Sequence, residues 1–308
     1  MMNAEGSRQQ AASGNAQPAT GNGPDAFRPS PLAARPGCRA FTMIEIAISL
    51  AVIGFALVAI IGVLPIGMNT QKANREETII NQDATVWMNA IRNGARGLDD
   101  LTNYVWAITN YVTEYDPTMT RVIRQWRNSY TTTNSSTVPP FPLTNGFRIV
   151  GLLSTPKYLP VLGRGGVLAG YLSNNVVAYV RSMSGAASEK FPQDNPDVKD
   201  FAFCYRMTSA VTPYWTNYYD PSWVDYGQPG LSASEIVARS NSWRVIVTLQ
   251  TNLHDLRLLF RWPLRSRGQL GLGSQSYRTL VGGQLLETND ISHRVYFFDP
   301  RTYVTNAP

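Results

Sequence analysis

The chain has 308 residues, and 27 Lys and Arg stand against 21 Asp and Glu, for a formal net charge of +6. Residues 1–40 contribute four Arg and two acidic residues, so the rest of the chain carries only +4 and a strongly basic nucleic-acid binder is not expected. With two Cys and two His, neither a disulfide framework nor a His-based metal or catalytic site is expected.

The first forty residues differ from all that follow. They are rich in Ala, Gly, Pro, Ser, Asn and Gln, and they contain almost no large apolar side chains. Such a segment cannot bury enough apolar surface to offset the entropy lost on ordering. We therefore expect residues 1–40 to be a disordered basic leader peptide.

A long apolar run follows the leader. Residues 46–68 are 23 consecutive uncharged residues, IAISLAVIGFALVAIIGVLPIGM, and a helix needs roughly 20 to cross a bilayer. A core helix of a soluble domain is rarely apolar on every face, so a transmembrane helix is predicted. Arginines precede the run, whereas mixed charges follow it. This asymmetry predicts a single-pass cytoplasmic (inner) membrane protein with a cytoplasmic N-terminus and an exported C-terminal domain.

The residues around the start of this run, RPGCRA followed by FTMIE, resemble the processing site of type IV pilins and type II secretion pseudopilins. The resemblance implies that Ala40 is the last leader residue and that Phe41 becomes the N-methylated first residue of the mature chain. Glu45 then stands at the acidic position of that motif, and Gly54 lies where these helices often have Gly. Pro65, which should kink the helix, lies one turn later than in major pilins.

The resemblance also implies a function and partners. The chain would be a structural subunit and not an enzyme, cleaved by a prepilin peptidase. It would contact other pilin-like subunits through its N-terminal helix, and a cytoplasmic-membrane assembly platform would build it into a pilus or secretion pseudopilus. Long chains of this kind also resemble a pilin-like group of verrucomicrobial cassettes called cassette protein B.

Glu45 is the residue to which the resemblance assigns a mechanism. A carboxylate at the centre of a bilayer costs about 2.5 to 3.5 kcal/mol, so it needs a partner or an interfacial position. In the family, this acid pairs with the new α-amine, here that of Phe41, on a neighbouring subunit. In the alternative, Glu45 marks the cytoplasmic edge of an uncleaved anchor, whose exported domain binds a ligand or acts as an enzyme.

The helix should continue beyond the apolar run. Ile80, Ala84, Trp87 and Ile91 recur at helical spacing, with polar residues such as Asp83 expected on the other faces. A helix over residues 41–95 is predicted, with a stop at the Asn-Gly pair 93–94 and its second half lying on a globular domain.

Residues 96–308 are predicted to form that domain, mainly an antiparallel sheet with long loops. Expected strands cover residues 147–153, 176–180, 201–207, 277–286 and 293–298, and arginines 121, 124 and 127 suggest one solvated helical face. The clearest signal is SWRVIVTLQTNLHDLRLLFRWP, in which two alternating runs predict a hairpin that turns at residues 251–252. The predicted fold class is α+β, with a spine helix packed on an antiparallel sheet.

Enzymatic and metal-binding motifs are sparse. The sequence contains no G-x-S-x-G, Walker loop or C-x-x-C. His254 is expected at the surface, on the face opposite to Asp255, and Cys204 should be an inert buried thiol. The loop 217–227 holds Asp220 and Asp225, and two carboxylates are a weak calcium signal. No cofactor is expected, and structural or subunit contact is the preferred role of this loop.

Overall fold

The computed structural model describes residues 41–94, 100–133, 139–184, 203–214, 230–265, 268–290 and 293–305. The expected leader, with Ala40, and the loop 217–227 lie outside these ranges. The chain divides into two compact units, residues 1–62 and 63–308. Within the first unit, the described part is the beginning of one long helix.

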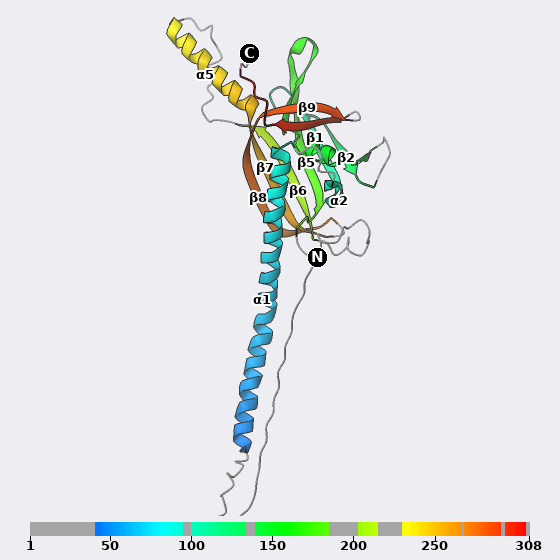
Figure 1. The fold of residues 1–308 in the computed structure, drawn as a ribbon, viewed down its shortest axis with the longest axis vertical. Helices are drawn as coiled ribbons and strands as arrows, with labels where there is room; N and C mark the ends of the chain where they lie inside the picture. The colour runs from blue at the N-terminus through cyan, green and yellow to red at the C-terminus, as the bar shows by residue number, and fades with distance from the viewer. Residues whose placement is uncertain are drawn as a thin grey trace, which may run out of the picture. The chain divides into compact units, whose positions relative to one another are not determined.

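That helix, α1 (Met43–Arg92), is 50 residues long and continues without interruption through Pro65 (Figure 1). It ends as predicted at the Asn-Gly pair. Gly94 has φ 55°, a left-handed conformation typical of the residue that ends a helix, and its N–H donates to the Ile91 carbonyl.

The two halves of α1 have different surroundings. Large apolar side chains from Phe41 to Met68 are all exposed, at 48% or more. From Ile79 onward, one face of the same helix is buried. Among the described residues, α1 is the one helix long and apolar enough to span a membrane.

The second unit is built on an eight-stranded sheet with the order β3-β2-β1-β5-β6-β7-β8, and β4 pairs with β5. The sheet is mixed and not purely antiparallel, because β3 runs parallel to β2. A separate two-stranded sheet contains β9 and β10. The elements after α1 are α2 (Leu101–Tyr104), β1 (Val105–Tyr115), β2 (Val122–Thr131), β3 (Phe141–Pro142), α3 (Gly146–Leu153), β4 (Tyr158–Leu162), η1 (Arg164–Gly166), β5 (Leu168–Arg181), β6 (Cys204–Pro213), α5 (Ala233–Asn252), β7 (Leu253–Leu264), β8 (Leu270–Gly282), β9 (Gln284–Asp290) and β10 (His293–Asp299).

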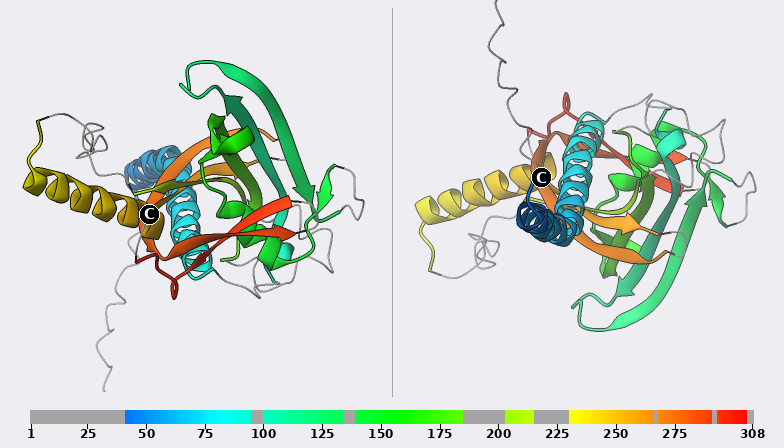
Figure 2. Two further views of the ribbon diagram at one scale, coloured as in Figure 1. Left: turned by 90° about the horizontal axis from the view of Figure 1, so that it is seen from above. Right: turned by 90° about the horizontal axis from the view of Figure 1, so that it is seen from below.

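The core lies on one face of the curved sheet, here called the inner face. Alternate residues of β6 and β7 meet there in register, such as Met207 opposite Phe260, and both are fully buried. The second half of α1, α3 and the β9–β10 hairpin all lie on this side (Figure 2). Phe147 of α3 stacks on Phe297 of β10 with ring centroids 4.1 Å apart. The α+β prediction, with a helix packed on the sheet, is therefore confirmed.

Several local predictions are wrong. The strand expected at 277–286 is divided at residue 283 between β8 and β9, which belong to different sheets. Residues 243–250, predicted as the first strand of a hairpin, belong to helix α5. Residues 147–153, also predicted as a strand, form helix α3. The arginines at 121, 124 and 127 do not share a helical face, because residues 122–131 form strand β2, paired antiparallel with β1. The predicted strand at 176–180 and the alternating run from Leu256 to Trp262 are confirmed in β5 and β7.

Candidate functional site

The start of α1 carries the residues that sequence analysis singled out. Phe41 precedes the helix and is 80% exposed. The Thr42 backbone N–H and hydroxyl each donate to Glu45 Oε2 at 2.9 Å, and the Glu45 N–H donates to Thr42 Oγ1 at 3.3 Å. This reciprocal arrangement has the form of a capping box, which satisfies backbone N–H groups at a helix start. Glu45 therefore caps its own helix within one chain, and all of these bonds to its carboxylate use one oxygen.

The two other predicted helix positions make few contacts. A Cβ added at Gly54 would meet nothing within 4 Å. Pro65 lies inside the continuous helix, and Thr70, five residues further on, donates a hydroxyl hydrogen bond to the Ile66 carbonyl at 3.0 Å. Both positions belong to the exposed, apolar part of α1.

A buried polar cluster fixes the second half of α1 to the sheet, at a position where sequence analysis expected a polar outer face. Trp87 Nε1 donates to the Tyr205 hydroxyl at 2.9 Å, and that hydroxyl donates to Asp83 Oδ2 at 3.0 Å. The Met183 N–H donates to the same oxygen at 3.0 Å. Asp83, Trp87 and Tyr205 are all fully buried. Burial raises the pKa of Asp83, although hydrogen bonds from residues 183, 184 and 205 oppose this shift.

The predicted surface location of His254 is also wrong. His254 is only 6% exposed, and its ring lies edge-on to Phe298 with centroids 5.2 Å apart. It points to the inner face, where Leu256 is also buried. Burial lowers the pKa of His254 to about 4. The imidazole is thus a neutral core side chain at neutral pH.

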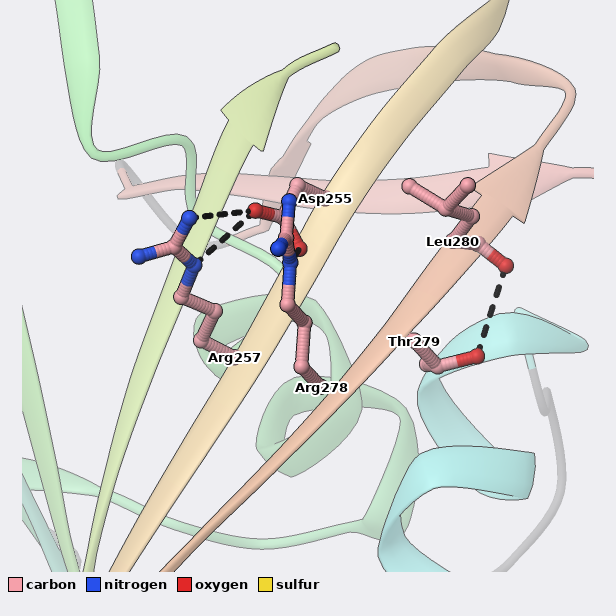
Figure 3. A network of polar contacts seen from close by, with 5 residues as sticks. All are labelled: Asp255, Arg257, Arg278, Thr279 and Leu280. Atoms are coloured by element: carbon pink, nitrogen blue, oxygen red, sulfur yellow. Dashed lines mark hydrogen bonds and ion pairs between the residues drawn. The ribbon is translucent and has the colours of Figure 1, made fainter.

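Asp255 lies on the opposite, outer face of β7, as the alternation of a strand predicts. Arg257 Nη2 and Arg278 Nε each approach one of its carboxylate oxygens at 2.8 Å (Figure 3). Burial opposes ionisation of Asp255, but the hydrogen bonds from the two arginines outweigh it and keep the pKa of the carboxyl below its usual value. The network links β7 to β8, and both guanidinium groups remain largely exposed.

Metal ligands do not gather in the part of the chain that the structure describes, where no group of three or more His, Cys, Asp or Glu is found. The weak calcium candidates Asp220 and Asp225 lie outside the described residues. Cys204 is half-buried at the start of β6, and burial raises the pKa of its thiol. A raised pKa disfavours the reactive thiolate, although the side chain is less buried than expected.

A second set of polar residues lies on the inner face and was not predicted from the sequence. Asn110 of β1 and Asn174 of β5 are 8% and 6% exposed and bond to each other. Neither residue lay in a strand predicted from the sequence, because no strand was expected around residue 110 and the strand expected at 176–180 begins after Asn174.

Comparisons with protein-family models, curated proteins and solved structures found no match.

Proposed function

We propose that the chain is a pilin-like structural subunit. A prepilin peptidase cleaves it after Ala40, Phe41 is N-methylated, and residues 46–68 hold the product in the cytoplasmic membrane with the C-terminal domain exported. An assembly platform then builds the subunits into a pilus or secretion pseudopilus.

The observation that carries the proposal is the division of α1 into two halves. One continuous helix buries its second half in a globular unit, while the large apolar side chains of its first half remain exposed. An apolar surface of this size needs lipid or other apolar helices around it. A subunit that is stored in a membrane and later packed against copies of itself uses both environments.

Glu45 gives the proposal its mechanism. Within one chain, Thr42 occupies only Oε2 of this carboxylate. The other oxygen can then accept from the α-amine that cleavage creates on Phe41 of a neighbouring subunit. Pairing an amine with a carboxylate removes most of the penalty for holding either charge among apolar helices. Assembly would therefore be favoured over an isolated subunit.

The test is replacement of Glu45 in the source organism. Glu45→Ala and Glu45→Gln should still insert in the membrane, because the apolar run is intact. Their recovery in filaments, or in cross-linked subunit oligomers, should fall about tenfold or more, as expected for the loss of one charge pair worth more than about 1.4 kcal/mol.

Glu77→Ala is the matched control, because Glu77 is an exposed acid on the same helix beyond the apolar run. It should assemble like the unmodified chain. Equal assembly of the Glu45 and Glu77 variants would contradict the charge-pairing role.

A permanently anchored binding protein is the second candidate. It is favoured by a pocket on the inner face of the sheet, and a pocket is not needed for filament assembly. The two functions differ at the N-terminus, because the anchored protein would keep its leader.

A further inference from the structure

A pocket of about 660 Å³ opens on the inner face of the sheet, beyond the area that α1 covers. Strands β1, β2 and β5 contribute lining residues, and so do β4 and the β9–β10 hairpin. Small-molecule sites commonly have volumes of about 300 to 1,000 Å³. The pocket belongs entirely to the second unit, and no residue of helix α1 lines it.

Two carboxamides inside the pocket have fixed orientations. Asn174 Nδ2 donates to the Pro156 carbonyl at 2.9 Å, so its Oδ1 faces the other way. There it accepts from Asn110 Nδ2 at 3.0 Å. Among the described residues, the buried Asn110 Oδ1 has no hydrogen-bond partner. A buried acceptor without a partner destabilises the protein, and a donor brought by a ligand would relieve this penalty.

Aromatic side chains stand beside these amides. Trp126 of β2 lines the pocket, and the Arg124 guanidinium stacks on its ring, 4.4 Å from the centroid. Tyr296 of β10 lines the pocket too, and burial, followed by the nearby Glu287, raises the pKa of its hydroxyl to about 12. Its hydroxyl is buried and stays protonated at physiological pH.

The lining has no net charge. Its two charged residues are Glu287 and Arg294, and they pair with each other at 3.2 Å. An ionic ligand would find no uncompensated partner here. A ligand with hydroxyls, each of which donates and accepts, would match both the amide oxygen and the tyrosine hydroxyl.

We propose that this pocket binds a neutral saccharide. Entry of the sugar brings a hydroxyl to Asn110 Oδ1, which has almost no accessible surface before the ligand binds, and other hydroxyls bond to the neighbouring polar side chains. The C–H face of a sugar ring packs on Trp126. The site adds recognition of a glycan to the exported domain, whether or not the chain assembles into a filament.

The test uses the full chain, purified in a detergent that has no sugar headgroup. Neutral and charged glycans are screened on an array, and the neutral glycan that binds best is titrated by calorimetry. Asn110→Leu and Trp126→Ala should each weaken this binding about tenfold or more, which corresponds to the loss of about 1.4 kcal/mol.

Each variant has a matched control on the outer face. Asn175→Ala removes an exposed amide next to Asn174, and Trp106→Ala removes a half-buried Trp that contacts Tyr179 and not the pocket. Both controls should bind like the unmodified chain. Trp126 is only half-buried, so its replacement keeps the test valid if Asn110→Leu fails to fold. The proposal is overturned if no neutral glycan binds, if only charged glycans bind, or if the folded pocket variants bind as well as their controls.

Discussion

At the residue scale, the Tyr205 hydroxyl joins helix and sheet. It accepts from Trp87 and donates to Asp83, and all three side chains are fully buried. Tyr205→Phe would leave the Trp87 N–H without its acceptor and remove one of the bonds to the Asp83 carboxylate. We expect it to lower the free energy of unfolding by about 1 to 3 kcal/mol, measured by chemical denaturation.

Tyr303→Phe is the control for this substitution, because Tyr303 is 55% exposed. The same atom is removed there in contact with water, so a change within about 0.5 kcal/mol is expected. Equal effects at the two tyrosines would show that the buried cluster does not hold α1 on the sheet.

The buried His254 should make the folded protein less stable in acid. Its pKa falls from an ordinary 6.5 to about 4 because the imidazole is buried, so the unfolded chain binds a proton at a higher pH than the folded chain. Above pH 6.5 the imidazole is neutral in both the folded and the unfolded chain, so it does not make the free energy of unfolding depend on pH. As the pH falls from 6.5 to 4, the free energy of unfolding should decrease by up to about 3 kcal/mol.

A substitution separates the acid destabilisation caused by His254 from that caused by protonation of carboxylates. His254→Leu cannot be protonated and keeps an apolar side chain against Phe298, so its stability should decline less steeply over the same pH range in denaturation experiments. If the free energy of unfolding of the variant falls with pH as steeply as that of the unmodified chain, the imidazole takes up its proton in the folded protein as readily as in the unfolded one.

At the scale of elements, the end of α1 depends on Gly94. A Cβ at this position would run into the Phe298 carbonyl oxygen, and the backbone is left-handed. Gly94→Ala should therefore destabilise the protein through both effects. Gly268 has φ 74° but open space around it, so Gly268→Ala should cost only the conformational strain, about 1 kcal/mol. In thermal denaturation, Gly94→Ala should lower the melting temperature more than Gly268→Ala does. Equal decreases would mean that a Cβ at Gly94 does not clash with the Phe298 carbonyl oxygen.

Helix α5 shows why an alternating pattern was misleading. Trp243, Val245, Val247 and Leu249 alternate as in a strand, yet the helix has no fully buried residue, so burial does not enforce helical spacing on them. The informative signal was at the start of the helix. The Ser232 hydroxyl and the Glu235 carboxylate form a capping box, a spacing that can be recognised in sequence.

Helix α3 was ambiguous for another reason. Seven of its eight residues are buried, so its short apolar run has no polar face to reveal the period. Asn145 marks the helix start, because its side chain accepts from the Arg148 N–H at 2.9 Å. In contrast, α1 and β7 were predictable, since their buried residues recur with the period of their element over a long stretch.

The candidate site was predictable only in part. The residues at the start of α1 form a local motif, which a sequence displays directly. Asn110 and Asn174 lie 64 positions apart and come together only through the pairing of β1 with β5. Asp83 was missed because a carboxylate is normally assigned to a solvated face, whereas this one is buried and a tyrosine hydroxyl and a backbone N–H donate to its Oδ2.

Across the whole molecule, the net charge of +6 is divided between two different parts of the chain. Residues 1–40 carry four arginines ahead of the apolar run, on the side of the membrane that the proposed topology places in the cytoplasm. The remaining chain combines an exposed apolar helix with a sheet domain that has its own core. The proposed cleavage after Ala40 would separate the arginines from the part that assembles.

Mass spectrometry of the N-terminal peptide, on protein isolated from membranes or filaments of its source, decides whether the chain is processed as proposed. We expect a mature chain that begins with N-methylated Phe41. A chain that retains residues ahead of Phe41, with an unmodified start at Met1 or Met2, would contradict it.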